Sequence, residues 1–168
     1  MHENGSRTLS MDAAVLVAAP DKLYIEIRAL GFPNTIVSYV RGALTIYQAR
    51  ENKVFQKKNS DSLGDVFASS LAWKTWIGVF ISDFHNVNWT EFYPRTCAIK
   101  RAQVASGETL EWGKPVDGVP SFTKISWNGG WLKWTYGKRE PNFEIPEPWF
   151  SVELPANVRF LENPSLLR

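Results

Sequence analysis

The chain contains little cysteine and little histidine, and this scarcity excludes several kinds of site. Cys97 is the only cysteine, so no disulfide can form within the chain and the fold must depend on its core. With one cysteine and two histidines, a zinc site of cysteine and histidine ligands is also excluded. We expect Cys97 to be a small, half-buried side chain on a strand. Its unpaired thiol favours a reducing compartment but leaves secretion open.

The chain also lacks a strong charge of either sign and a long hydrophobic run. Nineteen basic and seventeen acidic residues give a net charge of +2, too small to indicate a nucleic-acid partner. Residues 11–19 are apolar but too short to span a bilayer, so we expect no transmembrane segment. This segment is interpreted as a first strand or a short helix, with the end of a secretory signal as the less favoured alternative. We expect a soluble protein, cytoplasmic or secreted without a clear signal peptide.

Motifs of catalysis and cofactor binding are missing. There is no Gly-Xaa-Ser-Xaa-Gly sequence, no glycine-rich phosphate loop and no metal-ligand spacing, so we expect neither a cofactor nor a metal. Asp83 and His85 are the one candidate acid–base pair, because residues two apart on a strand share a face. A small hydrolase-type enzyme around this pair is the least favoured of three functional hypotheses.

Tryptophan, by contrast, is abundant and unevenly placed. All eight tryptophans lie between Trp73 and Trp149, mostly in short alternating segments with Lys, Thr, Ser and Asn. A tryptophan has a large apolar body and one N–H donor, so a cluster of them either fills a core or forms a binding platform. We assign three to the core because each lies on the apolar side of its segment: Trp76, Trp127 and Trp134.

The alternation of apolar and polar residues predicts strands through most of the chain. Strands are expected at residues 22–30, 35–48 (bent or divided at Gly42), 53–57, 76–82, 95–105, 109–112 and 158–161. One short helix is possible at residues 65–73. The predicted fold is mainly β: a single-domain antiparallel β-sandwich of about eight to ten short strands with at most one or two short helices. It would occupy residues 11–162, between a flexible tail at 1–10 and a C-terminal tail at 163–168.

Residues 123–136 are expected to form a β-hairpin with Gly129-Gly130 as its turn. This register places apolar side chains together on one face and leaves the other face polar except for Trp131. A turn one residue earlier would place Lys124 opposite Lys133, a repulsive pair, and is expected to mix the two faces. Trp131 is therefore predicted to be exposed and available for a ligand or a partner.

One segment carries a resemblance to a known family. Residues 77–93 contain the run Gly-Val-Phe-Ile-Ser at 78–82, and the residues after it include Asn, Trp and Tyr. The segment resembles the centre of the actinoporins and their fungal and plant relatives, with matches at Gly78, Val79, Ser82, Asn88 and Trp89. The fungal fruit-body lectins share that fold and place a similar loop after the equivalent strand. The resemblance covers about a tenth of the chain.

The resemblance implies a β-sandwich that recognises a phosphocholine headgroup or a sugar through an aromatic pocket. Aromatic faces attract a quaternary ammonium group or stack on sugars, and asparagine amides bind hydroxyl or phosphate oxygens. The expected ligand-binding residues are Asn86, Asn88, Trp89, Tyr93 and Trp131. The long amphipathic N-terminal helix of the actinoporins has no counterpart at residues 13–19, which argues against pore formation. The leading hypothesis is thus a non-enzymatic protein that binds a lipid headgroup or a glycan.

Two other interpretations stay open. The aromatic residues of this loop could simply pack under a strand connection, as half-buried aromatics in β proteins often do. The protein could also be an interaction or assembly module that docks a partner through exposed aromatics such as Trp131. Homo-oligomerisation is left open by the sequence.

Overall fold

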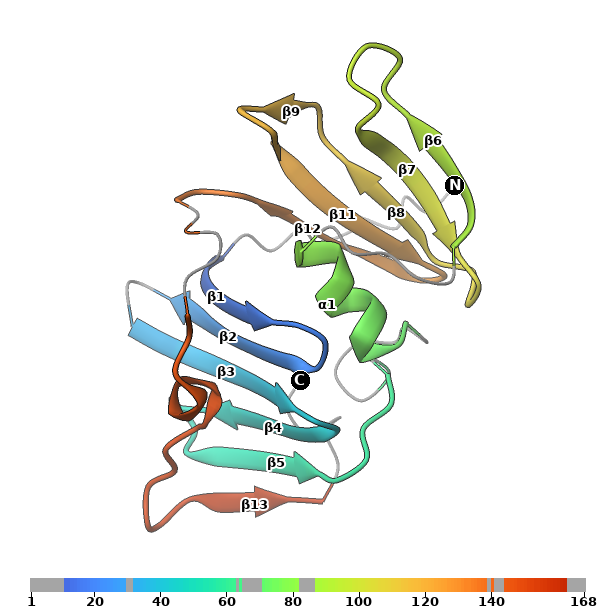
Figure 1. Ribbon diagram of the computed structural model, residues 1–168. Coiled ribbons are helices and arrows are strands. Elements are labelled where there is room, and N and C mark those ends of the chain that lie inside the picture. Colours follow the sequence, from blue (N-terminus) through green and yellow to red (C-terminus); the bar gives the residue numbers. More distant parts are fainter. Residues whose placement is uncertain are drawn as a thin grey trace, which may run out of the picture.

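The protein is built mainly from two antiparallel sheets, as the alternation predicts (Figure 1). The structure is a computed structural model, and it describes residues 11–29, 32–62, 64, 71–81, 87–138, 140 and 144–162. The predicted tails at 1–10 and 163–168 lie outside these ranges, as do residues 65–70 of the possible short helix. Side chains from both sheets and one helix join in a single hydrophobic core.

The first sheet has six strands in the order β1-β2-β3-β4-β5-β13. Its strands are β1 (Asp12–Ala18), β2 (Lys22–Ala29), β3 (Phe32–Val40), β4 (Ala43–Gln48), β5 (Lys53–Lys57) and β13 (Arg159–Leu161). Neighbours are antiparallel, except that β13 runs parallel to β5. The segment at 11–19 is thus a strand, and residues 35–48 form two strands separated by a turn at Arg41-Gly42, where φ is positive at both residues.

The second sheet has five strands in the order β12-β11-β8-β7-β6. They are β6 (Val87–Phe92), β7 (Ile99–Val104), β8 (Thr109–Trp112), β11 (Phe122–Trp127) and β12 (Gly130–Thr135). Between β8 and β11, the strands β9 (Pro115–Val116) and β10 (Val119–Pro120) form a two-residue ladder, outside the predicted strands. The described residues contain thirteen strands, more than the expected eight to ten, because this ladder and the three-residue β13 are too short to leave a pattern.

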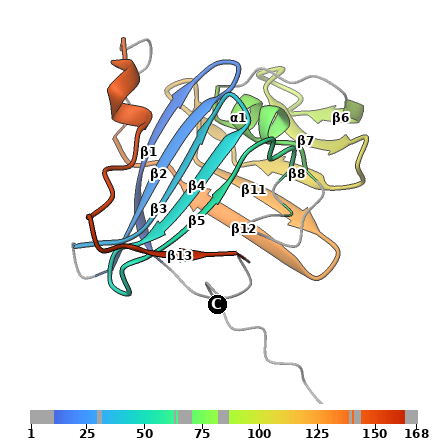
Figure 2. The same ribbon diagram turned by 90° about the horizontal axis from the view of Figure 1, so that it is seen from below.

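The strand predicted at residues 76–82 is wrong, because residues 76–81 belong to helix α1 (Trp73–Ile81) and residue 82 lies outside the described ranges. The helix lies between the two sheets (Figures 1 and 2). Trp73 stacks on Tyr39 of β3 with ring centroids 4.8 Å apart, and Phe80 stacks on Trp134 of β12 at the same distance. A helix with sheet on two sides is apolar all round, and such a run has the same composition as a doubly covered strand.

The C-terminal segment crosses the first sheet before it ends in β13 (Figure 2). It contains the short 3-10 helix η2 (Glu147–Phe150), which lies outside the predicted strands. Phe150 is buried, and its carbonyl oxygen accepts a hydrogen bond from the Ser38 hydroxyl of β3. Glu147 lies 3.4 Å from the Lys22 ammonium and 3.2 Å from the Arg41 guanidinium. These contacts attach the segment to β2 and β3.

Candidate binding face

The second sheet has one face in the core and one face toward solvent. On β11, Thr123 and Ile125 are fully buried, and on β12, Leu132 and Trp134 pack against the core. Alternation along the strands therefore turns the intervening side chains outward. We call this surface the outer face; its residues are Arg101, Gln103, Thr109, Glu111, Phe122, Lys124, Ser126, Trp131, Lys133 and Thr135.

The hairpin between β11 and β12 has a different register from the predicted one. Its turn is at Asn128-Gly129, with φ of +99° at Gly129, so Trp127 pairs with Gly130 and Ile125 with Leu132. The predicted register differs from this one by two residues. A shift of two residues leaves every side chain on the same face of the sheet, so the expectation that the earlier turn would mix the two faces is wrong. Lys124 does stand opposite Lys133, the arrangement that the prediction rejected.

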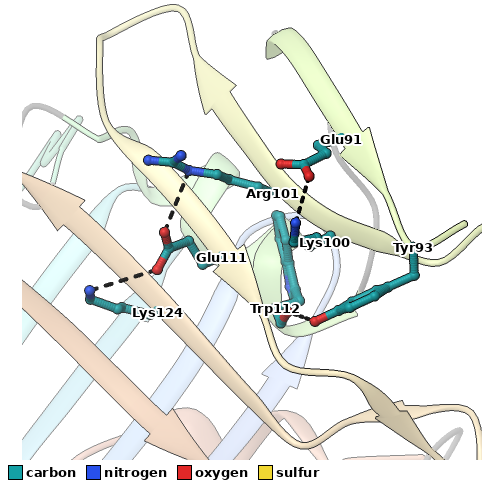
Figure 3. A network of polar contacts seen from close by, with 7 residues as sticks. All are labelled: Glu91, Tyr93, Lys100, Arg101, Glu111, Trp112 and Lys124. Carbon is teal, nitrogen blue, oxygen red and sulfur yellow. Dashed lines mark hydrogen bonds and ion pairs between the residues drawn. The ribbon is translucent and has the colours of Figure 1, made fainter.

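Four cross-strand pairs line up five charged residues in one row across the sheet. The row consists of Glu91, Arg101, Glu111, Lys124 and Lys133, each paired with the next. Within it, the Glu111 carboxylate lies 3.4 Å from Arg101 and 3.7 Å from Lys124, as Figure 3 shows. Glu91 instead forms a 2.6 Å ion pair with Lys100, and this hydrogen bond raises the pKa of the Lys100 ammonium. All three ion pairs are partly exposed to solvent and contribute little to stability.

The two lysines at the end of the row each contact an aromatic ring. The Lys124 ammonium lies 5.7 Å from the ring centroid of Trp131, and the Lys133 ammonium lies 4.2 Å from that of Phe122. Cation–π attraction of this kind offsets part of the repulsion between like charges on paired residues. Lys133 has no ion pair with any carboxylate of the described residues.

A second row, beside the charged one, is polar and ends in tryptophan. Gln103, Thr109, Ser126 and Trp131 are paired in turn across β7, β8, β11 and β12. The first three are half-buried, and Trp131 is 46% exposed, which confirms the prediction of an exposed Trp131. At the opposite edge, the backbone of Trp89 in β6 pairs with that of Gln103. The outer face therefore offers hydroxyl, amide and charged groups beside one exposed indole.

The predicted ligand-binding residues are not gathered into one pocket. Asn88 and Tyr93 lie in or just after β6, whereas Trp131 lies in β12 at the other edge of the sheet. Four strand spacings separate these edges, about 19 Å. Asn86 lies outside the described residues, as do Asp83 and His85, and only the backbone of Trp89 is described.

Of these two residues, Asn88 is exposed, whereas Tyr93 forms a hydrogen bond within the fold. The Asn88 amide nitrogen lies 3.4 Å from the Val104 carbonyl oxygen, a long and weak hydrogen bond. The Tyr93 hydroxyl donates to the Trp112 carbonyl oxygen at 2.9 Å (Figure 3), and its side chain is half-buried. Trp112, which the sequence leaves unassigned, is buried in the core.

Of the residues on the outer face, only Trp131 is predicted from the sequence as a binding residue. Alternation along β11 does predict that Phe122, Lys124 and Ser126 share one face. It does not predict which strands lie beside β11, because that follows only from the order of strands in the sheet.

Cys97 also differs from its expected setting. It is exposed, with φ of +53°, in the turn between β6 and β7, where its N–H donates to the Tyr93 carbonyl oxygen. Across the described part of the chain, no three Asp, Glu, His or Cys side chains come together as metal ligands. Within the same ranges, no helix combines the length and the apolarity needed to cross a membrane.

No protein-family model matches the chain, and no curated sequence is significantly similar to it. The resemblance at residues 77–93 therefore stays a prediction. In the structure its first residues are helical and its last ones are strand, where a strand and then a loop are expected.

Proposed function

We propose that the protein is a non-enzymatic binding protein that recognises a glycan on the outer face of the second sheet. The observation that carries the proposal is the exposed Trp131 at the end of a row of half-buried polar side chains. An indole face stacks on the apolar face of a sugar ring, while Gln103, Thr109 and Ser126 supply donors and acceptors for its hydroxyl groups.

The spread of these groups favours a glycan over a lipid headgroup. A single headgroup needs groups that converge on one small volume. Here the candidate groups follow a line across β7, β8, β11 and β12, three strand spacings or about 14 Å long. A line of this length suits an extended oligosaccharide.

The same arrangement favours a glycan over a protein partner. A docking surface for a protein is expected to expose a contiguous apolar patch. Three other aromatic residues are exposed in the described part of the chain, and each lies on a different element: Phe92 on β6, Trp149 on η2 and Phe160 on β13. Trp131 is instead surrounded by Lys124, Ser126 and Lys133.

Binding of the purified protein to a glycan array and to liposomes tests the proposal. We expect glycan binding that falls about tenfold or more in Trp131→Ala, a loss of about 1.4 kcal/mol. Trp149→Ala is the matched control, because Trp149 is similarly exposed but lies on η2. Absence of binding to every glycan, or equal losses in the two variants, would overturn the proposal. Binding to liposomes alone would favour the lipid headgroup.

A further inference from the structure

We infer that the paired lysines 124 and 133 bind an acidic group, so that the glycan recognised on the outer face is an anionic one. The inference rests on the proposed function and names its ligand class. The acidic group would be a carboxylate or a sulfate on the sugar chain. Both present oxygen acceptors to ammonium donors.

The two lysines repel each other. Lys124 and Lys133 are directly opposite on neighbouring antiparallel strands, which brings their Cβ atoms to about 5 Å. Like charges in such positions destabilise a sheet. A local arrangement that costs stability on a solvent-exposed face is more often found at functional sites than elsewhere. The two ammonium groups lie over rings on opposite sides of the pair, Trp131 for Lys124 and Phe122 for Lys133. An anion bound beside the pair would be attracted by both charges and would offset their repulsion.

The surrounding surface is positively charged. The outer face and the adjoining Glu91–Lys100 ion pair carry four cations against the two carboxylates of Glu91 and Glu111, a net charge of +2; the cations are Lys100, Arg101, Lys124 and Lys133. Glu111 offsets one of the two charges of Arg101 and Lys124, whereas Lys133 has no carboxylate partner among the described residues. The whole chain also has a net charge of only +2, hence this face holds as much net positive charge as the whole molecule. Its charge complements an anionic chain.

Two aromatic rings lie beside the lysine pair. Phe122 and Trp131 lie under the ammonium groups of Lys133 and Lys124, which restricts where those groups can move. Trp131 is next but one to Lys133 on β12, so both side chains project from the same face. A sugar ring stacked beside Trp131 would thus carry its acidic substituent close to the paired lysines.

The experiment compares polysaccharides that differ only in the acidic group. Polygalacturonate is paired with its methyl ester, and dextran sulfate with dextran, and affinities are measured at low and high salt. We expect the acidic member of at least one pair to bind tenfold or more tightly than its neutral partner. This preference should weaken between about 0.05 M and 0.5 M salt because of screening.

Variants assign the preference to the lysine pair. Lys133→Gln should remove most of the preference, whereas Lys133→Arg should retain it, because arginine keeps the charge. Lys58→Gln is the control, since it makes the same charge change at an exposed residue after β5. The melting temperature of Lys133→Gln should stay within about 2 °C of the parent's, because lost cation–π contact and relieved repulsion oppose each other.

The outcomes separate this inference from the function on which it rests. Equal binding of acidic and neutral members, or an unchanged preference in Lys133→Gln, would overturn the inference and leave glycan binding in place. Equal losses in Lys133→Gln and Lys58→Gln would also overturn it, because the effect would then be one of net charge alone. Failure to bind any glycan, with binding to phosphatidylserine vesicles instead, would overturn both.

Discussion

Two tyrosine hydroxyls show how much a residue's role depends on its hydrogen-bond partner. The Tyr93 hydroxyl donates to the Trp112 backbone carbonyl, which ties the end of β6 to β8. The Tyr136 hydroxyl instead accepts from the Trp134 indole at 2.8 Å and lies 2.7 Å from the Thr123 hydroxyl, which is fully buried. The sequence predicts Tyr93 as a ligand-binding residue, whereas its hydroxyl binds a backbone carbonyl. The type of residue is visible in the sequence, but this backbone partner is not.

The replacement Tyr93→Phe tests whether the Tyr93 hydroxyl stabilises the fold through its hydrogen bond to Trp112. It removes one hydrogen bond, so we expect the free energy of unfolding to fall by about 1 kcal/mol. Glycan affinity should stay unchanged, because Tyr93 is distant from Trp131. Urea denaturation and a glycan titration measure the two quantities. A large loss of affinity at unchanged stability would place Tyr93 in the binding site after all.

At the scale of elements, the β11–β12 hairpin shows why a charge argument failed. Repulsion between Lys124 and Lys133 does not prevent their pairing, because other groups that contact the two lysines offset part of it. In the structure Lys124 is also 3.7 Å from Glu111, and both lysines contact aromatic rings. Glu111 comes from β8, which is a sheet neighbour of β11 but is separated from it by the β9–β10 ladder in the chain. The pattern of the hairpin alone does not contain this contact.

The turn itself can be tested by replacing one glycine. Gly129 has φ of +99°, a conformation that side chains with a Cβ rarely adopt. We expect Gly129→Ala to lower the free energy of unfolding by roughly 1–2 kcal/mol. In Gly137→Ala, an added Cβ meets nothing within 4 Å and φ is not positive, so little change is expected. Similar values for the two variants in urea denaturation would contradict the assigned turn.

Helix α1 is the element that the sequence described least well. Its residues Trp76 to Ile81 form an almost continuous apolar run, which fits a buried strand as well as a buried helix. The helix is favoured by contacts with two sheets, through Tyr39 on one side and Trp134 on the other. These partners are separated from it in the chain by more than thirty residues.

At the scale of the whole molecule, the fold class and most of the first sheet were predictable. The strand predicted at residues 22–30 alternates clearly because Leu23 and Ile25 on one face of β2 are buried, while residues on the other face are not. The core assignments of Trp76, Trp127 and Trp134 are confirmed as well, since these residues are buried or packed against the core. The candidate site was predictable only at Trp131. Its other members come together through the order of strands in the second sheet, and local alternation does not encode that order.

The protein's response to alkaline pH follows from a tyrosine of the core. Burial, and then the negative charges of Asp21 and Asp61, raise the pKa of the Tyr39 hydroxyl above its ordinary 10.0. The folded protein therefore holds this proton more tightly than the unfolded chain does. The resulting stability is fully present below pH 10 and is lost as the pH rises through the higher pKa of the folded state.

We therefore expect the free energy of unfolding to fall between about pH 9 and pH 11, and to fall less in Tyr39→Phe, which has no proton to lose there. Part of the loss should persist in that variant, because burial and Glu26 also raise the pKa of Tyr24. Urea denaturation of both proteins at the two pH values measures the difference. An equal loss would show that Tyr39 ionises as readily in the folded chain as in the unfolded one, against its burial beneath the Trp73 ring.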